Sequence, residues 1–317
     1  SEDPSGLAAG DYTCVVTDAN GCNVTESAVT ITEPTTLSVN IIGGSSFNLY
    51  SISCNGGSNG ASLAEASGGT IGNGYTYAWN DPNSQTTAQA TGLSQGTFTV
   101  TVTDANGCTV STQATMTEPN ALTASNTTSS NNGYGVSCNA GTDGTATASA
   151  SGGVTGYTYA WNDPNSQTTA QATGLSAGTY ICTITDNNGC TTTTSATITE
   201  PDALTASSTT SSNTGFGVSC NGGNDGTATA AGADGAGSYT YAWNDPNSQT
   251  TATATGLSAG TYICTVTDGN GCTTTTSATI TEPDALTASS TTSSNTGFGV
   301  SCNGGNDGTA TAAGADG

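Results

Sequence analysis

The stretch YTYAWNDPNSQTTA, residues 157–170, is the part of this sequence that decides its fold. Its first six residues alternate Tyr, Tyr and Trp with Thr, Ala and Asn, and a period of two is typical of a β-strand with one buried face. The Asn-Asp-Pro-Asn segment at 162–165 overlaps the end of this alternating run and has the composition of a turn. The same stretch begins again, unchanged, at Tyr75 and at Tyr239. The sequence therefore contains a repeated β unit.

The period of this repeat is 82 residues, the spacing that separates Trp79, Trp161 and Trp243. Solenoid units are shorter, at about 20–50 residues, whereas a period of this length suits a small independent β-sandwich domain. A Glu-Pro pair recurs near the end of each repeat and gives the boundaries. We expect partial repeats at 1–34 and 284–317 and complete repeats at 35–119, 120–201 and 202–283.

Short alternating runs, separated by clusters of Gly, Asn and Asp, fill each repeat. In the second repeat we expect seven strands, among them Tyr134–Cys138 and Thr191–Thr199, with Trp161 on the middle strand. This pattern predicts an immunoglobulin-like sandwich. The predicted fold class is therefore all-β, with tandem immunoglobulin-like β-sandwich domains in a linear array.

Composition excludes several classes of function. The 317 residues contain no Lys, no Arg and no His, against 23 acidic residues, for a formal net charge of −23. The chain has no imidazole to act as a general base and no amine nucleophile, so we expect no enzyme. Nucleic-acid phosphates and anionic membrane surfaces should repel it. Its apolar runs are also too short for insertion into a membrane.

Four landmarks follow in fixed order in the third repeat: VSCNGGNDGTATA (218–230), YTYAWNDP (239–246), GLSAGTYICTVTDGNGC (256–272) and TEP (281–283). This order resembles the SprB-type repeat of very large surface adhesins of gliding Bacteroidetes, and the resemblance covers each complete repeat. It implies a tandem immunoglobulin-like array with an extracellular location at the bacterial cell surface. It implies nothing about a ligand.

Each repeat has few large apolar residues, and a domain of this size usually needs covalent or metal links in addition to its core. Two cysteines recur in every complete repeat. The Val-Ser cysteines follow Val-Ser, or Ile-Ser in the first repeat, and the Asn-Gly cysteines follow Asn-Gly. The first set is Cys54, Cys138 and Cys220, and the second is Cys108, Cys190 and Cys272.

The first repeat has only these two cysteines, because Val100 stands where the second repeat has Cys182. We therefore expect disulfides within repeats, each worth about 4 kcal/mol. The alternative follows from geometry: the two cysteines lie at opposite ends of a simple sandwich, so an Asn-Gly cysteine could meet the Val-Ser cysteine of the preceding repeat. The expected pairs are Cys54–Cys108, Cys138–Cys190 and Cys220–Cys272.

A third cysteine, at Cys14, Cys182 and Cys264, falls on an inward-facing strand position. It is either a small buried hydrophobic residue, a partner in an alternative local disulfide, or a bridge to another chain. Frequent cysteine indicates an oxidising, extracellular setting.

The carboxylates have no protein cation to neutralise them, and hard oxygen ligands of this kind suit Ca²⁺. We expect Ca²⁺ at the ends of the domains. For any single residue, the alternative is that Asp and Asn are turn formers. The best-placed groups are Asp104, Asn106, Glu118, Asp186, Asn188, Glu200, Asp202, Asp268, Asn270, Glu282 and Asp284.

These features together predict a structural role. We expect a subunit of an extracellular filament, built from tandem repeats that disulfides and Ca²⁺ stabilise, with copies of the chain as its partners. The alternative is the stalk of a giant bacterial cell-surface adhesin whose ligand-binding part lies outside this sequence. Surface glycans are a further candidate partner.

Overall fold

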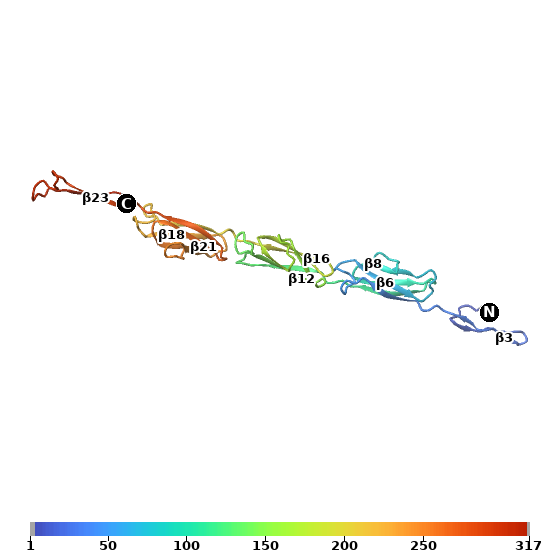
Figure 1. Ribbon diagram of the computed structural model, residues 1–317. Coiled ribbons are helices and arrows are strands. Elements are labelled where there is room, and N and C mark those ends of the chain that lie inside the picture. The colour runs from blue at the N-terminus through green and yellow to red at the C-terminus, as the bar shows by residue number, and fades with distance from the viewer. Residues whose placement is uncertain (1–3, 316–317) are drawn as a thin grey trace. The chain divides into compact units, whose positions relative to one another are not determined.

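The computed structural model describes residues 4–315 and builds them from strands, turns and bends, without a helix in that range (Figure 1). The chain divides into two compact units. The first holds the chain up to Ala124 together with Ala150–Thr158 and Ile184–Thr192, and the second holds Ser125–Ser149, Tyr159–Thr183 and the chain from Thr193. The second repeat thus contributes to both units, and the predicted repeat boundaries stay a prediction. Within the described range, no helix is long and apolar enough to cross a membrane.

The first unit contains the first complete repeat, a sandwich of two antiparallel three-stranded sheets. One sheet has the order β5-β6-β8 and the other the order β10-β9-β7. The strands are β5 (Ser38–Gly44), β6 (Gly60–Ser67), β7 (Thr76–Trp79), β8 (Gln89–Leu93), β9 (Gly96–Thr103) and β10 (Thr109–Met116).

Both sheets contribute to one core. Along β9, Phe98, Val100 and Val102 are buried and the intervening Thr residues are not, which is the expected alternation for a sheet with one covered face. Trp79 on β7 is buried in the same cluster as Leu93 on β8. The indole Nε1 of Trp79 donates to the carbonyl of Thr87 at 3.0 Å, so its polar atom is satisfied as well.

The second unit contains the third complete repeat with the same architecture, in the sheets β17-β18-β20 and β19-β21-β22. Its core includes Val218, Trp243, Leu257, Cys264 and Ile280. The strands are β17 (Thr205–Thr210), β18 (Gly226–Ala233), β19 (Thr240–Trp243), β20 (Thr253–Leu257), β21 (Gly260–Thr267) and β22 (Thr273–Ile280). The all-β, immunoglobulin-like sandwich predicted from the sequence is confirmed.

The second complete repeat has six strands at corresponding positions, and β12 pairs antiparallel with β14 from Gly144 opposite Leu175. These strands are β11 (Thr123–Thr128), β12 (Gly144–Ser151), β13 (Thr158–Trp161), β14 (Gln171–Leu175), β15 (Gly178–Thr185) and β16 (Thr191–Ile198). The partial repeats contain β1 (Gly10–Tyr12), β2 (Val15–Thr17), β3 (Asn23–Thr25), β4 (Val29–Ile31), β23 (Thr287–Thr292) and β24 (Ala310–Ala315).

The predicted strand Tyr134–Cys138 is wrong. This segment begins with an isolated bridge between Asn131 and Tyr134 and continues as bends. The backbone N–H groups of Gly135 and Val136 both donate to the carbonyl of Thr199, at 2.8 and 3.1 Å. Two successive N–H groups that share one acceptor cannot follow the alternating pattern of a β ladder. The resulting loop carries Cys138.

Candidate functional site

Two disulfides join consecutive repeats. Cys54 of the first repeat is bonded to Cys190 of the second, with a Cα–Cα distance of 5.7 Å. Cys138 of the second repeat is bonded to Cys272 of the third, with the same Cα–Cα distance. Both distances fall in the usual range for a disulfide. In each pair a Val-Ser cysteine meets the Asn-Gly cysteine of the following repeat, and we call these two places the inter-repeat sites.

The pairs predicted within repeats are therefore wrong, because the two cysteines of one repeat lie at opposite ends of β10 or its counterpart. The backbone N–H of Gly56 donates to Glu118 Oε2 at 2.7 Å, which places the loop of Cys54 beside the end of β10. Cys108 precedes the start of this strand, whose eight residues span about 26 Å. The predicted pairs that these two disulfides overturn are Cys54–Cys108, Cys138–Cys190 and Cys220–Cys272.

One partner in each site is the Asn-Gly turn, defined as residues 186–190 and 268–272. In the first of these, one carboxylate oxygen of Asp186 accepts from the backbone N–H groups of Asn188 and Cys190, both at 2.9 Å. Its other oxygen accepts from the N–H of Val154 at 2.8 Å. Gly189 has a φ of +84°, a conformation that a side chain would strain. Asp and Gly together therefore hold the cysteine in place.

The other partner is the Val-Ser loop, defined as residues 47–54 and 131–138. Phe47 and Tyr50 form an isolated bridge, with backbone hydrogen bonds of 2.7 and 3.0 Å. The N–H of Ser53 donates to Asn59 Oδ1 at 3.1 Å. These bonds fix the carbonyl groups of Phe47 and Ser53, which the next repeat uses as acceptors.

An asparagine side chain of the Asn-Gly turn forms hydrogen bonds with the Val-Ser loop of the preceding repeat. Asn188 Nδ2 donates to the carbonyl of Ser53 at 3.0 Å and to that of Phe47 at 3.4 Å. Its Oδ1 accepts from Asn48 Nδ2 at 2.5 Å. The amide is thus used as donor and acceptor at once, next to the disulfide.

The second site repeats this arrangement. Asn270 Nδ2 donates to the carbonyls of Ser137 and Asn131, at 2.9 and 3.4 Å, and Asn132 Nδ2 donates to Asn270 Oδ1 at 2.5 Å. Asn188 and Asn270, predicted as metal ligands, form hydrogen bonds between repeats in the structure. Asn48 and Asn132 were not predicted, because each is one asparagine among many in turn-forming segments and its local sequence carries no distinguishing signal.

The glutamates of the Glu-Pro pairs hold the Val-Ser loops to the ends of their own repeats. Glu118 Oε1 accepts from Asn55 Nδ2 at 3.0 Å. Glu200 and Glu282 accept from the backbone N–H groups of Ala140 and Gly222, at 2.6 and 2.7 Å. Their carboxylates therefore position the loops that carry the Val-Ser cysteines.

The remaining candidate calcium ligands lie in separate places. Asp104 and Asp268 accept backbone hydrogen bonds in their own turns, and Asn106 Nδ2 donates to Thr70 Oγ1 at 2.9 Å. Asp202 and Asp284 are exposed. In the described part of the chain, no three His, Cys, Asp or Glu side chains gather in a way that could hold a metal ion. Calcium binding stays a prediction.

Backbone hydrogen bonds also govern the ionisation of these turn carboxylates. The hydrogen bond from the Thr70 N–H is the largest effect on the pKa of Asp104, and with those from Cys108 and Asn106 it lowers that pKa against the opposing effect of burial. Burial is the largest effect at Asp268 and raises its pKa, but hydrogen bonds from Ala236, Cys272 and Asn270 outweigh it, and the pKa is lowered. These groups therefore stay ionised as acceptors.

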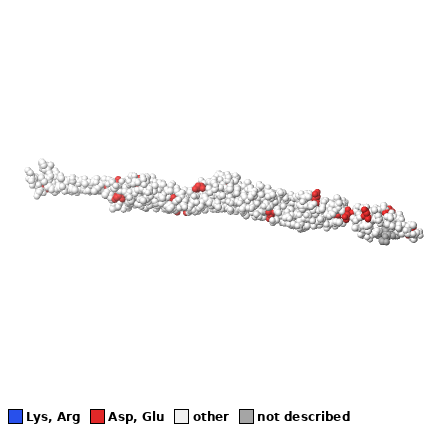
Figure 2. Space-filling model, turned by 90° about the horizontal axis from the view of Figure 1, so that it is seen from below, with Lys and Arg blue, Asp and Glu red and all other residues white. Residues whose placement is uncertain are grey.

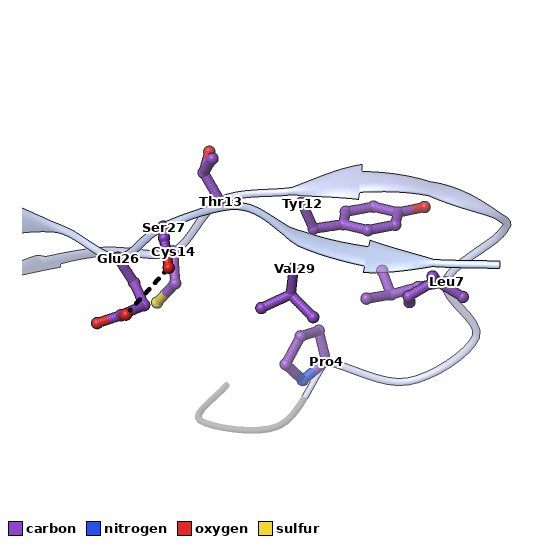
Figure 3. Close-up of a pocket in the computed structure, with 9 residues that line it drawn as sticks. Pro4, Leu7, Tyr12, Thr13, Cys14, Glu26, Ser27 and Val29 are labelled. Carbon is purple, nitrogen blue, oxygen red and sulfur yellow. Dashed lines mark hydrogen bonds between the residues drawn. The ribbon is translucent and has the colours of Figure 1, made fainter.

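Acidic groups are scattered rather than gathered on the face of the molecule in Figure 2. One hollow of about 350 Å³ lies in the first partial repeat, where Pro4, Leu7, Tyr12 and Val29 contribute apolar surface (Figure 3). Cys14 and Glu26 lie at one end of this hollow (Figure 3). Neither side chain is a cation.

The third cysteine of a repeat differs in its environment from the Val-Ser and Asn-Gly cysteines. Cys182 and Cys264 are fully buried and free, whereas Cys14 is exposed and free. Burial raises the pKa of the Cys182 and Cys264 thiols. Both side chains therefore behave as small core residues.

Comparison with known structures returns proteins with tandem domains. Three N-terminal domains of the Hoc protein of bacteriophage RB49 align with 14% identity and a TM-score of 0.37, over 77% of this chain and 97% of that one. A tetra-tandem repeat from the extending region of a large adhesion protein aligns with 19% identity and a TM-score of 0.31, over 88% and 83%. The eight N-terminal Ig domains of DSCAM align with 11% identity and a TM-score of 0.26, over 88% and 52%. No curated protein matches the chain.

The family model described as SprB repeat matches three segments, 46–84, 135–166 and 217–248. Each match lies inside one complete repeat and contains its Val-Ser cysteine and its Trp. The resemblance drawn from the sequence is thereby confirmed, and each of the three complete repeats contains a segment that matches the SprB repeat.

Proposed function

We propose that this chain is a structural segment of an extracellular filament in which consecutive SprB repeats are held together by inter-repeat sites. The observation that carries the proposal is that each of the two sites combines a disulfide with a docked asparagine. A chain whose repeats were independent would need neither. Two persistent disulfides also favour an oxidising, extracellular location at the cell surface.

Composition supports the same role. The chain has no Lys or Arg, so proteases that cut after basic residues find no site. It has no His or Lys for acid–base or nucleophilic chemistry, which fits a structural rather than an enzymatic role.

Electron microscopy of the purified, oxidised chain tests this proposal. We expect ordered filaments that lose their order when dithiothreitol reduces the disulfides. A chain that stays monomeric under oxidising conditions, across protein and salt concentration, would contradict filament formation.

The second candidate is the stalk of a large surface adhesin, which the SprB repeats favour. In this case the ligand-binding part lies elsewhere, and the repeats serve as a spacer. Monomeric particles that bind neither a glycan array nor intact cells would support the stalk, whereas binding to surface glycans by the repeats themselves would make them the adhesive part.

Calcium is a separate element of the proposal. It rests on the net charge of −23 and on exposed acids such as Asp202 and Asp284 beside the Glu-Pro pairs. We expect millimolar Ca²⁺ to raise the melting temperature and EDTA to lower it, with Mg²⁺ as the control for screening. Identical melting curves in Ca²⁺ and EDTA would refute calcium binding.

A further inference from the structure

We propose that the two inter-repeat disulfides make this chain a tether of limited extension, in which tension crosses the second repeat through residues 138–190 once the chain is pulled taut. The inference concerns the response of the repeats to pulling, and it holds for a filament and for a stalk alike. It rests on the bonds Cys54–Cys190 and Cys138–Cys272.

The two disulfides close loops of the chain that overlap. The sequence separations between the bonded cysteines are 136 and 134 residues. Cys138 lies within the first loop, and Cys190 lies within the second. Residues 138–190, which we call the shared segment, therefore belong to both loops and connect one disulfide to the other.

The shortest covalent route between Cys54 and Cys272 follows from this overlap. It crosses the first disulfide to Cys190, returns along the backbone to Cys138 and crosses the second disulfide. A pulled chain becomes taut along its shortest connection, so the shared segment is loaded against the direction of the sequence. Every other route includes at least one of two longer segments, which stay slack and which we call the slack segments: 55–137 and 191–271.

The two ends of the shared segment lie at opposite ends of the second repeat. Strand β12 begins at Gly144, shortly after Cys138. Just beyond the other end of this strand, the N–H of Val154 donates to Asp186 Oδ2 at 2.8 Å, in the turn that ends at Cys190. Tension between the two cysteines therefore acts along the strands. Ladder hydrogen bonds are perpendicular to the strands, so they resist this tension together.

In the folded chain, each junction between complete repeats has two covalent connections in parallel. One is a short peptide, 117–122 between β10 and β11 and 199–204 between β16 and β17. The other is the disulfide. Tension is thus shared at each junction while the repeats are folded. When they unfold, lengthening stops as soon as the shared segment is taut.

Stretching single molecules of the full chain by their two ends tests the proposal. In the parent protein for this experiment, serine replaces the five free, exposed cysteines: Cys14, Cys22, Cys108, Cys220 and Cys302. We expect dithiothreitol to increase the length at full extension by about 570 Å, at about 3.5 Å for each residue of the slack segments. No increase would overturn the proposal. So would an increase of about 180 Å, the value for a bond between Cys138 and Cys190 within one repeat.

Two variants of this parent test whether the loops overlap. Cys138→Ser with Cys272→Ser leaves the bond between Cys54 and Cys190, and Cys54→Ser with Cys190→Ser leaves the other bond. Each variant should lengthen on reduction by about 470 Å, because one disulfide alone also hides the shared segment. The two increases together then far exceed that of the parent. Increases that sum to the parental value, as two separate loops would give, or no increase in either variant, would overturn the proposal.

The matched control is Cys182→Val, a change within the shared segment. Cys182 is buried and free, so its replacement leaves both disulfides in place, and the increase should stay at about 570 Å. A different increase would show that this thiol takes part in a disulfide and would overturn the assigned route. Molecules are stretched one at a time, so the result does not depend on filament formation. Microscopy tests the filament separately, and failure of one proposal does not decide the other.

Discussion

The side-chain amide of Asn188 donates to the backbone carbonyl of Ser53 at 3.0 Å, although 135 residues separate them in the sequence. The disulfide between Cys54 and Cys190 lies directly beside this bond. Consecutive repeats are therefore joined by the peptide chain, by a disulfide and by a shared amide. The amide adds directional hydrogen bonds to the covalent link.

Replacing Asn188 by Asp should weaken the first inter-repeat site. The carboxylate cannot donate to the carbonyls of Phe47 and Ser53 and would face their negative ends, so we expect a loss of about 1–3 kcal/mol. Thermal unfolding measures the loss. The rate at which dithiothreitol reduces the disulfide at Cys190 should rise as well, because the docked turn shields it.

The control for this change is Asn106→Asp in the first repeat. Asn106 occupies the same place in its turn, but its Nδ2 donates only to Thr70 Oγ1 at 2.9 Å. We expect this variant to stay within about 0.5 kcal/mol of the parent, since it breaks one exposed bond. Equal destabilisation by the two variants would show that the amide at Asn188 has no special role.

Cyanogen bromide provides a direct test of the disulfide pairing. Met116 is the single methionine of the chain, so cleavage yields residues 1–116 and 117–317. The bond between Cys54 and Cys190 spans the cut, and we expect one band on a denaturing gel without reductant and two bands with it. A pairing of Cys54 with Cys108 would leave both cysteines in the first fragment and release the second.

Cys54→Ser is the matched control, because it removes the one disulfide that spans Met116 and should give two bands in both conditions.

Moving the methionine to the second repeat tests the other disulfide. Met116→Leu with Ile198→Met places the cut at a core position equivalent to that of Met116, where the bond between Cys138 and Cys272 spans it. Two bands without reductant from this variant would contradict the second inter-repeat disulfide.

The fold could be predicted from the sequence because its signals are local. The alternation along β9 identifies a strand and its buried face, and the repeated Trp at 79, 161 and 243 gives the length of the repeat. Neither signal requires knowledge of long-range contacts. The loop at Tyr134–Cys138 was predicted wrongly as a strand, since its composition resembles one. What decides its structure is a single distant acceptor, the carbonyl of Thr199.

The pairing of cysteines could not be decided in this way. Cysteine counts favoured pairs within repeats, whereas the eight-residue length of β10 forbids them. Whether a disulfide forms within a repeat or between repeats depends on which end of the sandwich each loop occupies, and on which adjacent repeat contacts it there. The sequence marks Asn188 as a turn residue with an oxygen that could bind a metal. Its role as a hydrogen-bond donor to Ser53 depends on the preceding repeat, which no local pattern encodes.

The buried third cysteine should be replaceable by valine. Cys182 is completely buried, and Val100 fills the equivalent position of the first repeat, also completely buried. Cys182→Val should therefore change the free energy of unfolding by less than about 1.5 kcal/mol. Cys182→Ser is the control, because burying a hydroxyl in place of the thiol should cost about 1–3 kcal/mol. A large loss from the valine variant alone would indicate a covalent role for this thiol.

Acid should destabilise the repeats through their buried turn carboxylates, of which Asp163 is representative. Its side chain is 3% exposed and accepts from the backbone N–H groups of Asn165 and Gln167, at 3.0 and 2.8 Å, and from Gln167 Nε2 at 2.9 Å. Burial is the largest effect and raises the pKa of Asp163. The side-chain and backbone hydrogen bonds of Gln167, with that of Asn165, outweigh it and leave the pKa below its ordinary value of 3.8.

A carboxyl whose pKa is lower in the folded state stabilises the fold above its unfolded pKa and loses that contribution as pH falls through the folded pKa. The melting temperature should thus be level from pH 7 to about pH 5 and fall below pH 3.8, the ordinary value shared with Asp81 and Asp245. Asp163→Asn turns one acceptor oxygen into a donor, so it should cost about 1–3 kcal/mol at pH 7. It should also reduce the fall below pH 3.8. Melting curves across pH for parent and variant measure both effects, and parallel curves would show that Asp163 does not contribute to the acid sensitivity.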